Sequence, residues 1–436
     1  MPATADATQD ASRTFDTRTG KRVKDDQSSI PFALPDITEA EIEAVSDSVR
    51  SGWLTTGPNS AAFEKEFASF LGDGLEAVAV NSATAGLHLA VEALGLGPDD
   101  EVLVPTWTFT STAEVVRYVG ANPVLVDVEP GSLNIDFAAA ERAITERTRA
   151  ILPVHFAGLP VPRGDLSKFA SSHGLEVVED AAHAFPVISE GRLVGDSESA
   201  AVVFSFYATK TMTTGEGGML VTRRPEIAER ARTMRLHGIS RDVFDRYTST
   251  KPNWHYEVVA PGYKYNLPDP AAAIGRVQLR RSKDMTAARQ RIAERYNTEL
   301  AGLPLQLPAQ PREPGGHAWH VYAMRLADDA PVSRDRFVER MAEMGVGTSV
   351  HFIPLHMHPY WRDTLQLKCA DFPVASEVFN RVVSLPIFSA MTDRQIERVI
   401  RSVHKALASS PQEQRSTRRP DDPEVSTFSC DERNRG

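Results

Sequence analysis

Cysteine is scarce in this chain of 436 residues, which has only Cys369 and Cys430. Two cysteines can form one bridge at most, so the fold does not depend on a disulfide framework. No group of cysteines and histidines has the spacing of a zinc site, and we predict no metal centre. This sparing use of cysteine is typical of proteins from a reducing compartment.

Long hydrophobic runs and an excess of positive charge are also missing. The longest apolar stretches are broken by polar residues such as Asn81, Thr84 and His88, so none is long enough to cross a bilayer. Residues 1–26 hold no apolar segment of a secretory signal. Acidic residues outnumber basic ones, 58 to 48, and the net charge of −10 argues against a nucleic-acid groove or a basic membrane patch. We therefore expect a cytoplasmic protein with neither nucleic acid nor a membrane as partner.

The remaining composition is that of a globular protein large enough for two domains. Hydrophobic residues make up 42% of the chain, which is enough for a substantial core. We expect residues 1–28 and 410–436 to be disordered, because these polar segments bury too little apolar area to offset chain entropy. In residues 29–280, short apolar runs alternate with helical patterns, which predicts an α/β domain with a mostly parallel sheet covered on both faces. Residues 281–409 predict a smaller C-terminal α+β domain.

Three helices can be placed from their ends and their apolar faces. One is expected to begin after Thr38 as its N-cap, and its apolar face holds Ile42, Val45 and Val49. A long amphipathic helix is expected over about residues 274–300. The last helix begins at Thr392, where Gln395 three residues later completes a capping box.

Two residues at strand ends suggest a chemistry. Lys210 follows the apolar run at residues 200–204 and precedes a glycine-rich turn at residues 215–218, while Asp180 ends the apolar run at residues 175–180. A lysine amine can form a Schiff base, and a carboxylate can keep a pyridine nitrogen protonated, which is what pyridoxal phosphate (PLP) chemistry requires. Taken singly, each residue has a plainer interpretation as a surface lysine or a helix N-cap. Together they favour the cofactor, with Lys210 and Asp180 as catalytic residues.

The turn at residues 81–86 predicts a phosphate site. It joins an expected strand to an expected helix, and small residues there let backbone N–H groups approach a phosphate while hydroxyls add donors. We predict Ser82, Thr84 and Ala85 as phosphate contacts. Ser205 could reach the same phosphate from the strand that precedes the lysine. Many turns between a strand and a helix look like this one, so the pattern is weak by itself.

Three further residues are candidates for contacts to the cofactor ring. Phe109 is our first choice to stack on the ring and Trp107 the second, although core packing is the commoner role for either aromatic. His183 lies three residues beyond Asp180, and one helical turn would bring it to the same side, where it could contact the ring hydroxyl. A lone histidine is more often structural, so this assignment depends on Asp180.

The order of these motifs resembles the DegT/StrS-type nucleotide-sugar aminotransferases, which are PLP-dependent enzymes of fold type I. Within that family the chain looks most like the enzymes that aminate UDP-4-keto-L-arabinose, the UDP-4-amino-4-deoxy-L-arabinose–oxoglutarate aminotransferases. The resemblance covers roughly residues 31–408 and rests on nine motifs in order: SGWLTTGP (51–58), NSATA (81–85), PVH (153–155), EDAAH (179–183), GEGG (215–218), LHG (236–238), GYKYN (262–266), HAWH (317–320) and SLP (384–386).

The resemblance implies an aminotransferase that moves an amino group from an amino acid to a nucleotide-linked keto sugar. Glutamate is the expected amino donor. The pathway would make a polysaccharide, a lipid-linked sugar or a secondary metabolite. It also implies a homodimer with shared active sites, in which Lys264 reaches the cofactor phosphate of the partner subunit, with Asn266 as the alternative. Four residues resemble the substrate-facing positions of the family: Trp53, Thr55, His351 and His356.

Some positions depart from the family pattern. Pro162 stands where relatives usually carry aspartate, and Pro268 and Pro270 stand where relatives carry threonine and isoleucine. These departures leave the details of sugar recognition and of the dimer contacts open, and a keto-cyclitol remains an alternative acceptor. Two other functions also remain: a PLP-dependent sugar dehydratase of the same family and a non-catalytic PLP-fold binding protein. The dehydratases typically replace the lysine with histidine, so Lys210 argues against the first.

Overall fold

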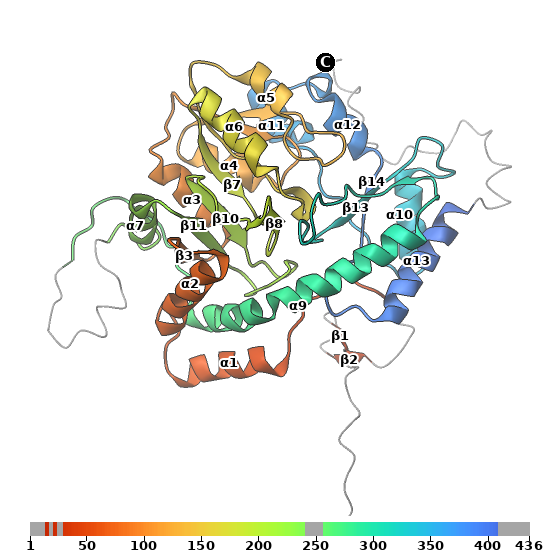
Figure 1. Cartoon of the computed structure of the whole chain (residues 1–436), viewed down its shortest axis with the longest axis horizontal. Helices are drawn as coiled ribbons and strands as arrows, with labels where there is room; N and C mark the ends of the chain where they lie inside the picture. Colours follow the sequence, from red (N-terminus) through yellow and green to blue (C-terminus); the bar gives the residue numbers. More distant parts are fainter. Residues whose placement is uncertain (1–13, 17–20, 24–28, 240–255, 409–436) are drawn as a thin grey trace, which may run out of the picture.

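The computed structural model describes residues 14–16, 21–23, 29–239 and 256–408 (Figure 1). Two segments were expected to be disordered. Residues 410–436 lie wholly outside the described residues, and so does most of residues 1–28. Within the first of these segments the structure has a small antiparallel pair, β1 (Thr14–Asp16) and β2 (Lys21–Val23). No helix in the described part of the chain is both long and apolar enough to cross a membrane.

A seven-stranded sheet forms the centre of the larger part of the molecule. Six strands run parallel, and one, β11, runs antiparallel between two of them. This confirms the expected α/β class with a mostly parallel sheet. The strands in spatial order are β3 (Glu76–Val80), β11 (Gly218–Thr222), β10 (Ala201–Ser205), β7 (Glu176–Asp180), β6 (Thr148–Ile151), β4 (Glu101–Pro105) and β5 (Asn122–Val126).

Helices cover both faces of this sheet, which explains why its strands are nearly continuous runs of apolar residues. In β10, for example, Val203 packs into the core on one face, while Val202 and Phe204 pack into the core on the other. The first face carries α3 (Ala83–Ala93), α4 (Ser111–Tyr118) and α7 (Pro225–Met234). The second carries α2 (Pro58–Leu71), α5 (Phe137–Ala143), α6 (Arg163–His173) and part of the long helix α9 (Asp269–Glu299). A short hairpin, β8 (Ile188–Ser189) with β9 (Arg192–Leu193), lies outside the main sheet.

The smaller part is built on a three-stranded antiparallel sheet. Its strands are β12 (Leu305–Gln306), β13 (Tyr322–Leu326) and β14 (Val382–Leu385). Its longer helices are α10 (Arg334–Glu343) and α13 (Asp393–Leu407), and the Thr392–Gln395 capping box at the start of α13 is present as expected. Two short helices, α11 (Pro359–Leu365) and α12 (Pro373–Phe379), contribute to the core on the large sheet.

Helix α9 joins the two parts without interruption. It runs through residue 280, where we had placed a domain boundary, so the backbone has no break at that position. Leu279 and Met285 belong to the core below the large sheet, whereas Ile292 and Tyr296 belong to the core of the smaller part. Figure 1 shows the helix lying across both halves of the molecule.

The first residues of the continuous stretch 29–239 also belong to the smaller part. Ile30 is buried in its core and pairs with Val346. The backbone N–H of Ile30 donates to Gly345 O at 2.8 Å, and the N–H of Gly347 donates to Ile30 O at 2.8 Å. The predicted assignment of all residues from 29 to 280 to the large domain therefore does not hold for this segment.

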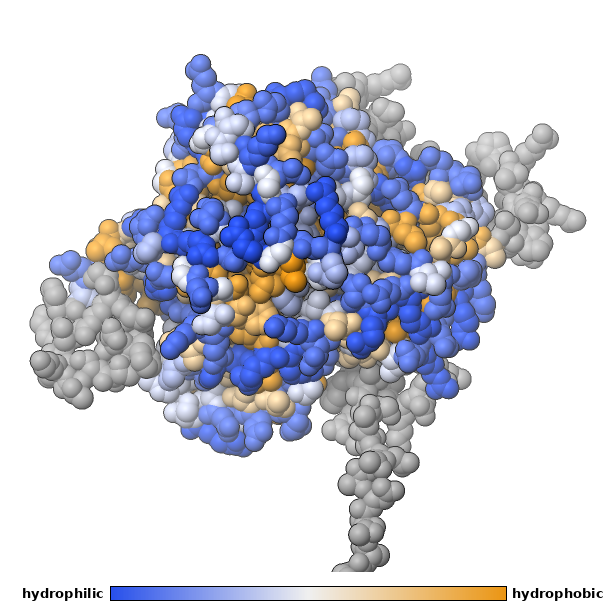
Figure 2. Space-filling view, in the orientation of Figure 1, coloured by the Kyte–Doolittle hydropathy of each residue, from blue (hydrophilic) through white to orange (hydrophobic). Residues whose placement is uncertain are grey.

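Helix α1 (Glu39–Arg50) has the expected N-cap, Thr38, but its apolar face is exposed. Ile42 and Val49 are 51% and 52% exposed, whereas Glu41 is buried. Glu41 accepts hydrogen bonds from Gln278 (2.8 Å) and Arg281 (2.6 Å) of α9. The helix therefore packs on α9 through its polar side. In the view of Figure 2, hydrophilic residues cover most of the surface and hydrophobic residues appear in separate groups.

Candidate active site

The predicted site residues gather where strands of the large sheet end. Asp180 is the last residue of β7 and Ser205 is the last residue of β10, and these two neighbouring strands run parallel. Ligands of such sheets bind outside the carboxyl ends of the strands. Lys210 follows in the turn between β10 and β11, where its backbone N–H donates to Tyr207 O at 2.9 Å.

Lys210 has an environment in which its ammonium group loses a proton more easily than usual. Burial lowers the pKa of its ammonium group to about 8, although the charge of Asp180 acts in the opposite direction. Its Nζ lies 3.5 Å from Nε2 of His320. An amine with a pKa near 8 can act as a nucleophile and as a base close to neutral pH.

Asp180 is buried, and each of its carboxylate oxygens accepts a hydrogen bond. Thr112 donates from Oγ1 to Oδ2 at 2.8 Å, and the backbone N–H of Ala182 donates to Oδ1 at 3.0 Å. The backbone N–H of Asp180 donates to Pro153 O at 2.9 Å, which holds the end of β7 in place. The carboxylate is therefore fixed at both oxygens and satisfied as an anion.

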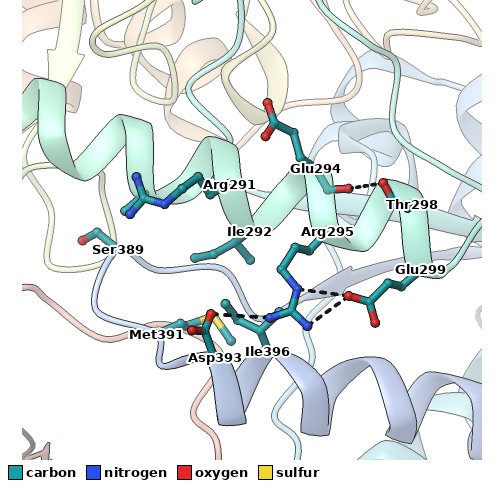
Figure 3. A pocket seen from close by; sticks show the side chains of 11 residues that line it. Arg291, Ile292, Glu294, Arg295, Thr298, Glu299, Ser389, Met391, Asp393 and Ile396 are labelled. Atoms are coloured by element: carbon teal, nitrogen blue, oxygen red, sulfur yellow. Dashed lines mark hydrogen bonds and ion pairs between the residues drawn. The ribbon is translucent and has the colours of Figure 1, made fainter.

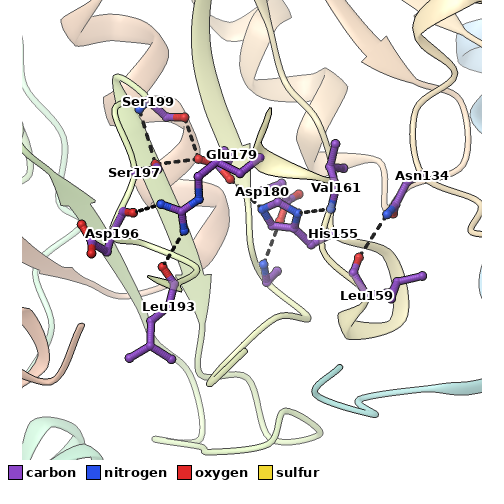
Figure 4. Close-up of polar contacts among 12 residues, drawn as sticks. Asn134, His155, Leu159, Val161, Glu179, Asp180, Leu193, Asp196, Ser197 and Ser199 are labelled. Carbon is purple, nitrogen blue, oxygen red and sulfur yellow. Dashed lines mark hydrogen bonds and ion pairs between the residues drawn. The ribbon is translucent and has the colours of Figure 1, made fainter. Parts of the chain in front are cut away.

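The neighbouring Glu179 anchors the same strand from the other side (Figure 4). Its Oε1 accepts from Ser197 (2.7 Å) and Ser199 (2.6 Å), and its Oε2 accepts from Nε2 of His155 at 2.9 Å. The backbone N–H of Val161 donates to Nδ1 of His155, so Nε2 is the ring nitrogen that donates to Glu179. Burial alone would raise the pKa of Glu179, but the hydrogen bonds from His155 and the serines outweigh it and lower the pKa to about 2.

Strand β11 brings the predicted phosphate contacts together. Gly218 pairs with Ser205 on one side and with Val80 on the other, two residues before Ser82. A Cβ on Gly218 would lie 2.7 Å from the carbonyl carbon of Ser82, so only glycine allows this approach. Ser82 is the N-cap of α3 and accepts from the N–H of Ala85 at 3.1 Å.

This arrangement fits the phosphate of PLP. The amino end of α3 includes Thr84 and has the hydroxyl of Ser82 as its N-cap, and Ser205 stands two strands away, across Gly218 of β11. A helix amino end with adjacent hydroxyls suits a dianionic group. Together with a buried lysine and a buried carboxylate at neighbouring strand ends, the donor set matches what the cofactor requires.

The comparisons with known proteins agree with this geometry. The sequence profile of the DegT/DnrJ/EryC1/StrS aminotransferase family matches residues 35–404. The chain belongs to this family. The spore coat polysaccharide biosynthesis protein SpsC of Bacillus subtilis is 44% identical over 376 residues, which are 86% of this chain and 96% of SpsC.

Solved structures give the same result. Spr1654 of Streptococcus pneumoniae, assigned as a sugar aminotransferase, is 31% identical in its pyridoxamine phosphate form, with a TM-score of 0.81 over 86% of this chain and 98% of that chain. It has also been solved in its PLP form. PseC of Helicobacter pylori, an aminotransferase involved in the biosynthesis of pseudoaminic acid, is 25% identical, with a TM-score of 0.79 over 87% of this chain and 99% of that chain. The chain is thus a PLP-dependent sugar aminotransferase of fold type I.

In this aminotransferase, His183 lies near Lys210 in a group of rings that includes the buried His320 and the half-buried Phe352. The rings of His183 and His320 are 4.4 Å apart, and the ring of Phe352 stacks on His183 at 5.8 Å. Burial, with the charge of Lys210, lowers the pKa of His183 well below its usual value, so the ring is neutral. Phe109 is 61% exposed and lies 6.3 Å from Phe352, whereas Trp107 is fully buried in the core. Of the two aromatics, only Phe109 is accessible to a ligand.

Sequence reasoning missed His320 and Thr112 as site residues. His320 stands 110 residues after Lys210, and Thr112 stands 68 residues before Asp180. His320 was part of a motif that carried the family resemblance, which was the only signal for it. No local spacing rule connects residues so far apart in the chain.

The predicted substrate-facing histidines differ in their surroundings. His351 donates to or accepts from Ser384 at 3.0 Å, and burial, with the charge of Lys210, lowers its pKa to about 4. His356 is buried, and its two ring nitrogens bond to Thr106 (2.8 Å) and Ser376 (3.0 Å). Because no ring nitrogen of His356 is left for a ligand, the structure corrects its assignment: this histidine ties the end of β4 to the segment at α12.

The other predicted contacts lie near the amino end of α9. Trp53 is half-buried and Thr55 is exposed, and the N–H of Asp269 donates to Thr55 O at 3.1 Å. The side chain of Asn266 donates to Thr56 at 2.8 Å within its own chain. Lys264 is exposed, and its carbonyl accepts from the side chain of Asn81 at 3.3 Å, beside the phosphate turn. Lys264 and Asn266 were both considered for contact with the cofactor phosphate of the partner subunit. The side chain of Asn266 is already bonded within its own chain, whereas that of Lys264 is exposed.

A pocket of about 460 Å³ lies between α9 and α13 (Figure 3). None of the predicted site residues lines it. Its Arg295 is already paired with Glu299 and Asp393. Among the described residues, no group of histidine, cysteine, aspartate and glutamate is arranged to hold a metal ion.

Proposed function

We propose that this enzyme moves an amino group from glutamate to a nucleotide-linked keto sugar in the biosynthesis of a polysaccharide, a lipid-linked sugar or a secondary metabolite. The observation that carries the proposal is the buried Lys210, whose pKa is lowered to about 8. It lies in the same site as the carboxylate of Asp180, which accepts a hydrogen bond at each oxygen. The names of SpsC and PseC, which refer to polysaccharide and sugar biosynthesis, support the substrate class.

PLP supplies the carbon that receives the amino group and a ring that accepts electrons. In the proposed mechanism Lys210 holds the cofactor as a nucleophile and then moves a proton between the α carbon of the donor and C4′ of the cofactor. With a pKa of about 8, roughly a tenth of the lysine is unprotonated at pH 7. The negative charge of Asp180 keeps the ring nitrogen protonated, which increases the electron demand of the ring.

The remaining contacts divide between cofactor and substrate. We assign Ser82, Thr84, Ala85 and Ser205 to the phosphate, and Phe109 and His183 to the ring. For the substrate we keep Trp53, Thr55 and His351. Neutral imidazole and hydroxyl groups suit a sugar, because they can both donate and accept hydrogen bonds.

We also propose a cytoplasmic homodimer. Phe109, Tyr207 and Tyr360 are 61%, 47% and 56% exposed, and the apolar face of α1 is exposed as well. Large apolar side chains that remain exposed are candidates for contact with a second subunit. A second subunit would cover them, and the exposed cation of Lys264 would suit the dianionic phosphate of the partner.

The replacement Lys210→Ala tests the chemistry. We expect a loss of transamination of about 10⁴-fold or more, together with the loss of the absorbance band of the lysine-bound cofactor, because no other group on the chain replaces this nucleophile and base. Lys168→Ala, on the exposed face of α6, is the matched control and should keep both. Near wild-type turnover of Lys210→Ala would show that the lysine is misassigned.

A panel of acceptors tests the substrate. The pyridoxamine form of the enzyme is mixed with nucleotide-linked keto sugars, with the corresponding free keto sugars and with keto-cyclitols, and the decay of the pyridoxamine absorbance is followed. We expect fast decay only with a nucleotide-linked ketone. Fast decay with a cyclitol or a free sugar would contradict the nucleotide linkage and leave the aminotransferase assignment standing.

A further inference from the structure

Two buried threonines connect the end of β4 to Asp180. Thr108 and Thr112 are 2% and 0% exposed, and their hydroxyl oxygens are 2.8 Å apart. Thr112 lies in the first turn of α4, and its Oγ1 lies 2.8 Å from Oδ2 of Asp180. We call Thr108 and Thr112 the threonine pair.

The direction of these hydrogen bonds is determined by the carboxylate. An ionised carboxylate can only accept, and a threonine hydroxyl has one proton to donate. Thr112 therefore donates to Asp180, and its oxygen must accept the proton of Thr108. The chain of donors runs from Thr108 to Thr112 to Asp180, and it leaves Thr112 with a single orientation of its hydroxyl.

Asp180 has few other restraints on its side chain. Among the described residues, Thr112 is the one side chain that donates to it, and the backbone N–H of Ala182 holds the second oxygen. Two donors on two different oxygens fix the plane of the carboxylate. A branched side chain at position 112 is itself restricted at χ1, so it can hold its hydroxyl in one place.

We propose that the threonine pair is a positioning device that aims the carboxylate of Asp180 at the ring nitrogen of PLP. This inference rests on the proposed role of Asp180. Neither threonine touches the substrate, and both act through Asp180. Hydrogen bonds that are made to a charged group in a buried site are stronger than those between neutral groups.

The test uses replacements that change the hydroxyl and keep the shape. Thr112→Val removes the hydroxyl with almost no change in volume, and Thr112→Ser keeps it. Thr110→Val is the matched control, because Thr110 lies on the same segment but its hydroxyl bonds away from Asp180: it donates to Glu114 at 3.0 Å and accepts from Nε1 of Trp361 at 3.0 Å. Asp180→Asn serves as the reference for loss of the charge.

The decisive readout is the protonation of the ring nitrogen, measured by ¹⁵N NMR with PLP labelled at that atom. We expect Thr112→Val to move the nitrogen signal toward that of Asp180→Asn, and to weaken PLP binding by roughly tenfold, as loss of a hydrogen bond to a charged group predicts. Thr112→Ser and Thr110→Val should keep the wild-type signal and stay within about threefold of wild-type affinity. A purely structural role of Thr112 would change the melting temperature and leave the nitrogen signal unmoved.

The possible failures can be told apart. If Thr112→Val keeps the wild-type signal and affinity while Asp180→Asn changes both, the threonine pair has no positioning role. If Asp180→Asn itself leaves the nitrogen signal unchanged, the proposed role of Asp180 is wrong and the inference falls with it. Should Thr112→Val fail to fold, Thr108→Val decides the question, because it frees the hydroxyl of Thr112 and should give a smaller change in the same direction. An unchanged nitrogen signal in folded Thr108→Val would overturn the proposed positioning role of the threonine pair.

Discussion

Glu179 shows how one buried carboxylate links pH to stability. It is 6% exposed, and its pKa in the folded protein is lowered to about 2 from an ordinary value of 4.5. A carboxyl group with a lowered pKa stabilises the fold fully above its unfolded pKa, and this contribution is lost as the pH falls through the folded value. The contribution is on the order of 3 kcal/mol and disappears between about pH 4.5 and pH 2.

We therefore predict that Glu179→Gln flattens the pH dependence of the free energy of unfolding in this window. Gln keeps the size of the side chain but cannot titrate, so the wild-type protein should lose more stability than the variant between pH 4.5 and pH 2. Urea unfolding followed by circular dichroism at several pH values measures the two slopes. Equal slopes would mean that Glu179 is not the group responsible. At pH 7 the variant should be the less stable protein, because its NH2 group replaces one accepting oxygen of Glu179 and meets a donor there, either His155 or the serines.

At the residue scale, the sequence predicted those site residues that local signals mark. Asp180 and Ser205 end apolar runs, and Ser82 is the N-cap of a helix that follows a strand. All three were therefore expected at the edge of the sheet where the carboxyl ends of its parallel strands meet. Thr112 and His320 could not be found in this way, because only the tertiary fold brings them to their partners. His356 was misjudged for the related reason that its partners, Thr106 and Ser376, are distant in sequence.

At the scale of elements, the sequence likewise predicted where helices begin but not what they pack against. The beginning of α1 at Thr38 and of α13 at Thr392 followed from local capping signals. Periodicity also identified the apolar face of α1, but it carries no information about what covers that face. In the folded chain the partner is α9, which offers Arg281 and Gln278, so the polar side of α1 turns inward.

Arg289 of α9 leads to a prediction about the contact between the two parts of the molecule. It is 2% exposed, and its Nη1 donates to Trp319 O (3.2 Å), His320 O (3.4 Å) and Ile387 O (2.7 Å). Arg289→Met keeps much of the volume but leaves buried carbonyls without donors. We expect a loss of about 3 kcal/mol in the free energy of unfolding, measured in urea.

The matched control for this prediction is Arg291→Met, two residues further along α9. Arg291 is exposed, so this replacement should change the stability by no more than about 0.5 kcal/mol. Similar stabilities for the two variants would show that the contacts of Arg289 do not hold the backbone of His320. Weaker PLP binding by Arg289→Met alone would connect this helix to the position of the ring of His320 beside Lys210.

At the scale of the whole molecule, the proposed dimer can be tested by complementation. Lys210→Ala and Lys264→Ala should each be inactive or nearly so, because each removes one residue from every site. In a hybrid dimer, one of the two sites receives Lys210 from one chain and Lys264 from the other. Random mixing makes about half of the dimers hybrid, so activity should rise to about a quarter of that of the wild type.

Activity is measured after the two variants are unfolded and refolded together, and each variant refolded alone is the control. Hybrid dimers are verified by tags of different mass. If verified hybrids stay inactive, Lys264 does not serve the site of its partner. A chain that remains monomeric at every concentration would contradict the proposed dimer itself.

The pairing of Ile30 with Val346 has a consequence for the order in which the protein folds during synthesis. A ribosome delivers the chain from its amino end, so Ile30 emerges long before Gly345 and Gly347, which bond to it. The strands of the large sheet end at Thr222 and can all be in place by then. The segment around Ile30 must therefore wait, unpaired, for most of translation, although it is among the first parts of the chain to be made.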